Sequence, residues 1–60
     1  MFNKEIEDKI DQLEGKLSSE EENYVMSVRA HQSNAVLKTI RQNIYKIKEE
    51  LESLYSEKNS

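Results

Sequence analysis

The sequence predicts an all-α protein, a helical hairpin of two helices in which the second helix is long. Apolar residues recur every three or four positions, and the chain combines 35% charged residues with no Pro and one Gly, which is typical of long helices and coiled coils. Sixty residues make one helical domain, residues 1–60, and a chain of this length buries only about 60% of the surface that its unfolded form exposes. Because the sequence has no Cys for disulfides, we expect self-association or a partner protein to supply further stability.

The first helix is predicted from about residue 3 to residue 15. Its apolar residues step by four, four, three and four positions and so share one side of a helix: Phe2, Ile6, Ile10, Leu13 and Leu17. Gly15 can end this helix in a left-handed conformation, and Ser18 or Ser19 can cap the next one. The acidic run that follows suits the positive end of a helix dipole. The sequence therefore favours a turn at about 15–19.

The second helix is predicted from about residue 19 to residue 57. Its apolar residues step by three and four in strict alternation, a heptad seam: Leu37, Ile40, Ile44, Ile47, Leu51 and Leu54. Counted back, this seam reaches Met26 and Asn23 and does not share the register of the first helix, so a turn or a stutter must separate them. An alternative turn at 30–34 also separates the two registers. It gives two nearly equal helices and sets Leu17 opposite Ile44 or Ile47.

Narrow apolar stripes on two helices leave flanks that gain from contact with a second hairpin. We therefore expect a homodimer, an antiparallel four-helix bundle or coiled coil. The predicted self-association seam comprises Ile6, Ile10, Leu13, Leu17, Leu37, Ile40, Ile44, Ile47, Leu51 and Leu54. Leu at heptad position a with Ile at position d favours more than two strands.

Charge is distributed in blocks along the chain. The net charge is −5 over residues 1–22, +5 over residues 23–48, which contain no Asp or Glu, and −3 over residues 49–60. Blocks of opposite sign on antiparallel helices place acids beside bases. The cationic middle is therefore expected to be the docking surface of the acidic first helix.

The cationic middle also contains two candidate binding surfaces. A polar face roughly opposite the seam could follow a phosphate backbone or an acidic protein groove, although an ordinary solvated face fits it too: His31, Asn34, Lys38, Arg41, Gln42 and Tyr45. A second group interrupts an apolar arc with polar residues and could be completed by another protein: Val25, Met26, Arg29, Gln32, Ser33 and Val36. Alternatively, Arg29 belongs to a register-setting polar layer and pairs with Glu5, Glu7 or Asp8 of a neighbouring helix, or its side chain extends out to water.

The chemistry of the sequence argues against an enzyme. It has no Cys, one His and no Gly-rich phosphate loop, so we expect no catalytic, cofactor or metal site. The charged first residues and the lack of an apolar run predict a cytoplasmic protein without a membrane segment. We expect a small adaptor or inhibitor-like regulator that self-associates and binds another protein. The alternative is an RNA- or DNA-binding helical dimer that uses the cationic face.

Overall fold

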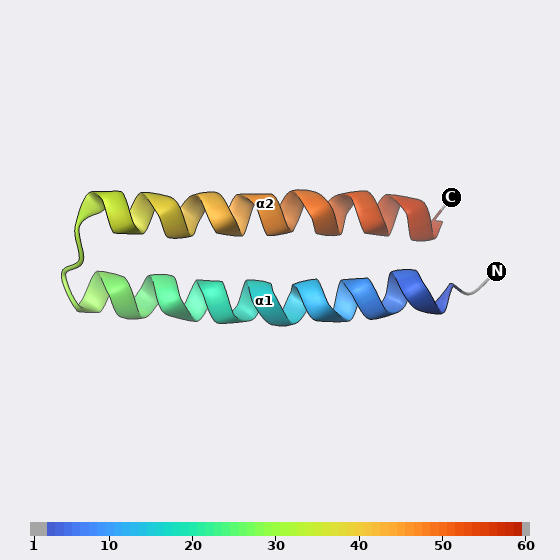
Figure 1. Ribbon diagram of the computed structural model, residues 1–60, viewed down its shortest axis with the longest axis horizontal. Coiled ribbons are helices and arrows are strands. Elements are labelled where there is room, and N and C mark those ends of the chain that lie inside the picture. Colours follow the sequence, from blue (N-terminus) through green and yellow to red (C-terminus); the bar gives the residue numbers. More distant parts are fainter. Residues whose placement is uncertain (1–2, 60) are drawn as a thin grey trace.

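The computed structural model describes residues 3–59, which form the predicted helical hairpin. Helix α1 (Lys4–Arg29) and helix α2 (Asn34–Asn59) pack side by side in antiparallel directions, joined by a short turn at one end of the molecule (Figure 1). The described residues contain no strand. The molecule is a rod of 47 × 14 × 11 Å, and we call the end opposite the turn the open end.

The turn lies at residues 30–33, at the alternative position rather than at about 15–19. The favoured helix bounds of 3–15 and 19–57 are therefore wrong, and the second helix is not the longer one, since each helix has 26 residues. Gly15 has no positive φ, and Ser18 and Ser19 lie inside α1.

The physical reason is that the apolar register of α1 continues past Leu17. The same steps of three and four lead to Glu20, Tyr24 and Ser27, which are all half-buried. A helix that ended at Gly15 would lose these contacts, and the helix-end signal of Gly15 and the capping signal of Ser18 or Ser19 are too weak to compensate for them. The mismatch between the two seams is accommodated in the turn at 30–33 instead.

The turn is closed by a Schellman motif followed by a helix cap. The N–H of His31 donates to Val28 O at 3.1 Å and that of Gln32 donates to Ser27 O at 3.0 Å, the two bonds that define the motif. His31 takes the left-handed conformation, with φ 56°, that Gly usually provides. Ser33 then caps α2, because its Oγ accepts a hydrogen bond from the N–H of Val36 at 3.3 Å.

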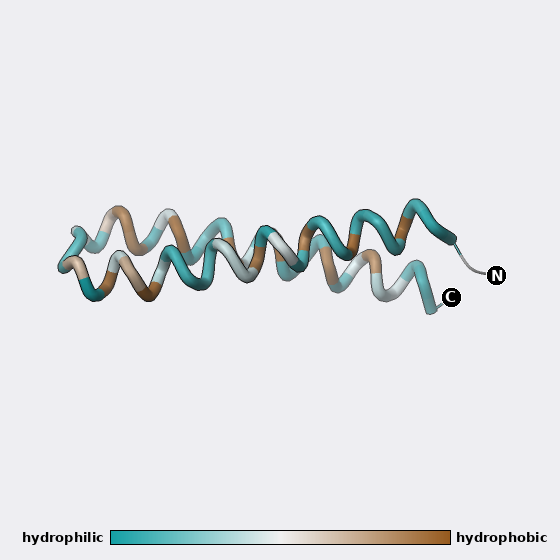
Figure 2. Tube along the Cα trace, turned by 90° about the horizontal axis from the view of Figure 1, so that it is seen from below, coloured by the Kyte–Doolittle hydropathy of each residue, from teal (hydrophilic) through white to brown (hydrophobic). Residues whose placement is uncertain are grey.

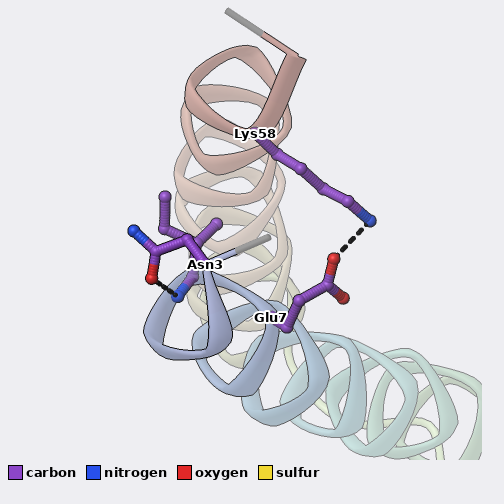
Figure 3. Close-up of polar contacts among 4 residues, drawn as sticks. Asn3, Glu7 and Lys58 are labelled. Atoms are coloured by element: carbon purple, nitrogen blue, oxygen red, sulfur yellow. Dashed lines mark hydrogen bonds and ion pairs between the residues drawn. The ribbon is translucent and has the colours of Figure 1, made fainter. Parts of the chain in front are cut away.

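The open end is held by a cap and an ion pair (Figure 3). Asn3 caps α1, with Oδ1 accepting hydrogen bonds from the N–H groups of Glu5 at 3.1 Å and Ile6 at 3.4 Å. Lys58 Nζ of α2 lies 2.6 Å from Glu7 Oε1 of α1. The hydrogen bond to Glu7 and the negative charge of that carboxylate raise the pKa of Lys58. This pair joins the last turn of α2 to the first turns of α1.

The core is a single row of side chains between the helices. Within residues 3–59 the buried apolar side chains are Ile10, Ile40 and Leu51. The other seven predicted seam residues are half-buried: Ile6, Leu13, Leu17, Leu37, Ile44, Ile47 and Leu54. Phe2 lies outside the described residues. Apolar segments recur along both helices between hydrophilic ones (Figure 2). Because all ten predicted seam residues are buried or half-buried in a chain whose two helices pack on each other, the seam predicted for self-association forms the contact between these helices.

Candidate interaction surface

The two long sides of the hairpin differ in chemistry. One side, which we call the tyrosine face, has two grooves between α1 and α2 that share Lys48. The groove nearer the turn is lined by Glu21, Tyr24, Val25, Arg41, Ile44, Tyr45 and Lys48. The groove nearer the open end is lined by Glu14, Leu17, Lys48, Leu51, Glu52 and Tyr55. All three tyrosines of the chain therefore line this side.

The opposite side, the polar face, has grooves with mostly polar margins. One is lined by Lys9, Gln12, Leu13, Glu50, Ser53 and Leu54, and the other by Lys16, Ser19, Glu20, Asn43, Lys46 and Ile47. The apolar residues in these two sets belong to the seam itself. Leu13 and Leu54, and likewise Ile47, are already half-buried between the helices.

Opposite charges line the two edges of the tyrosine face. On the α1 edge, Glu14 and Glu21 line the grooves, and Asp11 lies one turn before Glu14. On the α2 edge, Arg41 and Lys48 line the grooves, and Lys38 lies one turn before Arg41. Glu52 adds one acid to the α2 edge near the open end.

Tyr55 connects these two edges. Partial burial raises the pKa of its phenol, and the negative charge of Glu14 and a hydrogen bond to that carboxylate raise it further. The Tyr55 side chain is 40% exposed. Tyr55 of α2 therefore lines the same groove as Glu14 of α1 and still presents part of its ring to solvent.

All six residues predicted to bind a partner protein gather around the turn. Met26 is 61% exposed, Val25 48% and Val36 40%, and Arg29, Gln32 and Ser33 are exposed too. The neighbouring Val28 is also exposed, at 46%. We call Val25, Met26, Val28, Arg29 and Val36 the turn-end patch. Arg29 is exposed in the last turn of α1, where a cation suits the helix dipole, which disagrees with a buried polar layer.

Five of the six residues predicted for the nucleic-acid face lie in a row on α2. Asn34, Lys38, Arg41, Gln42 and Tyr45 are exposed, and their spacing places them on one side of that helix. His31 does not belong to this row, because it lies in the turn. Ser33, predicted as a partner contact, uses its hydroxyl to cap α2.

Only part of the acidic first block lies along the cationic middle. With the turn at 30–33, the part of the cationic segment nearest the turn folds back on itself, and the described parts of the two acidic segments, residues 3–22 and 49–59, both extend to the open end. Where the two blocks do lie together, residues of opposite charge line the same grooves. Glu21 lines a groove with Arg41, and Glu14 lines one with Lys48.

Sequence reasoning did not assign Glu20, Tyr24 or Ser27 to the contact between the helices. The signal that could have found them was the unbroken spacing from Ile6 through Leu17, which predicts these positions next. Glu20 and Ser27 are polar, so a search for regularly spaced apolar residues does not find them.

Neither a metal cluster nor a membrane span occurs in the described part of the chain. Across residues 3–59 no group of three or more His, Cys, Asp or Glu could hold a metal ion. Over the same residues neither helix combines the length and hydropathy that crossing a membrane requires. Comparison with protein-family models, curated proteins and solved structures finds no match.

Proposed function

We propose that this chain is a small cytoplasmic, non-enzymatic interaction protein, an adaptor or inhibitor-like regulator that self-associates and binds another protein through its turn-end patch. The observation that supports this proposal is the exposure of Val25, Met26, Val28 and Val36 around one end of a chain whose core is a single row. Contiguous exposed apolar surface on a soluble protein commonly marks an interaction site. Arg29 lies within the same patch, and Arg and Met are enriched at interfaces.

Charge defines the kind of partner. Residues 23–48 contain five Lys or Arg and no acid, and they surround the turn. Arg29 and Lys38 are both exposed at this end. The fitting partner is therefore a protein with an apolar groove and an acidic rim. Unbranched Met side chains adapt to the shape of such a groove.

Site-specific photo-cross-linking tests this proposal. A photoreactive phenylalanine at Met26 should cross-link a protein, whereas the same group at Gln12, exposed on the polar face, should not. The captured protein is then purified and titrated with the unmodified chain. Met26→Ala and Arg29→Ala should each weaken this binding by about tenfold, as expected for residues central to an interface, and Gln12→Ala should leave it unchanged. Equal cross-linking from both positions, or equal affinities of all variants, would contradict the proposal.

The second candidate is a nucleic-acid-binding dimer, favoured by the exposed α2 row that includes Lys38, Arg41 and Tyr45. Binding of labelled duplex DNA and labelled single-stranded RNA is measured by fluorescence anisotropy at several salt concentrations. Phosphate contacts would make affinity fall steeply with salt, and Lys38→Glu with Arg41→Glu would abolish it. On the protein-binding proposal we expect no such binding, since the whole chain has a net charge of −3.

A further inference from the structure

The hairpin exposes more surface than a compact chain of its size. Its accessible surface is 4955 Å², and its mass is 7.1 kDa. A compact monomer of this mass exposes about 4,100 Å². The difference of about 850 Å² is close to the area of about 800 Å² that each partner buries in a standard protein interface. Because the heptad seam is already used within the chain, a second copy has to contact another side.

The tyrosine face is the side that gains most from such contact. Tyr45 is 64% exposed and Tyr55 40% exposed on this side, and Val25 lines the same groove as Tyr45. On the polar face, the groove margins outside the seam carry Lys, Gln, Ser, Asn and Glu side chains, which lose water contacts when covered. Met26 and Arg29, by their helical spacing, lie away from the tyrosine face and stay accessible when it is covered.

Two symmetric arrangements can bring two tyrosine faces together. A two-fold axis along the rod lays α1 of each copy over α2 of the other and sets both turns at the same end. A two-fold axis across the rod lays α1 over α1 and α2 over α2, with the turns at opposite ends. The choice depends on the edges of the face.

Charge selects the arrangement with both turns at the same end. The α1 edge carries Asp11, Glu14 and Glu21, and the α2 edge carries Lys38, Arg41 and Lys48 beside Glu52. The axis along the rod therefore lays an acidic edge over a basic edge twice. The axis across the rod would lay acids over acids and bases over bases, which is unfavourable.

The position of the exposed apolar side chains selects the same arrangement independently. Val25, Val28 and Tyr45 all lie in the half of the rod nearer the turn. With both turns at the same end, the two apolar groups meet each other. With the turns at opposite ends, each group would meet the more acidic open end of its neighbour, where Glu5, Glu7 and Asp8 lie.

We propose that a second copy of this chain docks on the tyrosine face with both turns at the same end, so that each α1 packs on the neighbour's α2 in a four-helix bundle. This inference rests on the self-association stated in the proposed function and specifies its surface and orientation. The dimer covers Val25 and Val28 of each turn-end patch and leaves Met26 and Arg29 of both copies accessible at the same end, which gives the partner protein a two-fold site.

Distance measurement between spin labels tests the orientation. The sequence has no Cys, so Gln32→Cys in the exposed turn provides a single labelling position in the full chain. Double electron–electron resonance should give a distance well under half of the 47 Å length of the rod. A distance close to that length would show the turns at opposite ends and overturn the proposal. The absence of any dipolar signal at high protein concentration would show a monomer and overturn it too.

Charged substitutions test which face is covered. Tyr45→Glu should weaken the dimer at least tenfold in sedimentation equilibrium, and Ser53→Glu, its match on the polar face of α2, should leave it unchanged. As a control, circular dichroism should show that both variants keep their helix content. A dimer weakened by Ser53→Glu and not by Tyr45→Glu would assign the interface to the polar face and overturn the inference.

The dimer and the partner site are separable in these experiments. Met26→Ala should leave the spin-label distance unchanged while it weakens binding of the cross-linked protein. A monomeric chain that still binds that protein through Met26 would refute the dimer alone. A same-end dimer that captures nothing from Met26 would refute the partner site alone.

Discussion

At the scale of single residues, Gly15 is the weakest helical position of α1. It lies exposed within the helix, and a Cβ added there would meet no atom within 4 Å. Gly15→Ala should therefore raise the free energy of unfolding by about 1 kcal/mol and the Tm by about 4–8 °C. Thermal unfolding followed by circular dichroism measures the change, and Ser18→Ala, also exposed in α1, should give a smaller gain. A loss of stability at Gly15 would mean that another chain approaches the outer side of α1, against the proposed dimer face.

His31 is the other residue whose backbone argues for a specific substitution. A left-handed conformation costs a residue with a Cβ about 1–2 kcal/mol, whereas Gly adopts it freely but loses more chain entropy on folding. Because His31 has a φ of 56°, His31→Gly should raise the free energy of unfolding by about 0.5–1 kcal/mol. His31→Val should lower the free energy of unfolding by more than that. Urea denaturation measures both variants. Equal midpoints for Gly and Val would show that the turn relaxes to a different conformation.

At the scale of the elements, Glu20 interrupts the seam of α1. It is half-buried and lines a groove with Ile47, Asn43 and Lys46 of α2. Glu20→Leu extends the apolar contact between the helices and should raise the free energy of unfolding by about 1 kcal/mol, roughly half the value of a fully buried Leu. The matched control is Glu22→Leu on the exposed side of α1, which should change stability little. A loss with Glu20→Leu would show that this carboxylate has a favourable contact at the seam.

The elements also show what the sequence could predict. The spacing of apolar residues predicted two helices and ten seam residues, which lie buried or half-buried between the helices, but it missed Glu20, Tyr24 and Ser27 at the same contact. The turn was not predictable with certainty from local signals, because Gly15 and the serines after it resemble a helix end while the seam continues through Glu20 and Tyr24. The real turn has no Gly or Pro and depends on His31 in a conformation that sequence rarely reveals. The candidate partner residues were predicted as one group. In the structure Val25 lines the tyrosine face, whereas Met26 and Arg29 lie away from it, and this division depends on how the two helices pair.

At the scale of the whole molecule, contacts at and near the open end predict a loss of stability at alkaline pH. Lys58 and Tyr55 both have pKa values raised above their ordinary values of 10.5 and 10.0. A group with a raised folded pKa stabilises the fold below its unfolded pKa, and this contribution is lost as pH rises through the folded pKa. The Tm should therefore decline as pH rises above about 10. Lys58→Gln with Tyr55→Phe should make that decline shallower, and Lys4→Gln should not. An unchanged slope in the double variant would mean that other groups cause the decline.

The response of the dimer to salt separates what holds it together from what orients it. The Debye length falls from about 10 Å at 0.1 M salt to about 3 Å at 1 M, so exposed charges such as Glu21 and Arg41 interact much less at the higher concentration. Solvated ion pairs contribute only tenths of a kcal/mol each, whereas the covered Tyr45 and Val25 side chains contribute through burial. We therefore expect the dissociation constant, measured by sedimentation equilibrium, to change only about severalfold between these concentrations. The spin-label distance at Gln32 should broaden at high salt as the opposite-end arrangement becomes less unfavourable. Complete dissociation at high salt would instead show that the charged edges, and not the tyrosines, hold the two copies together.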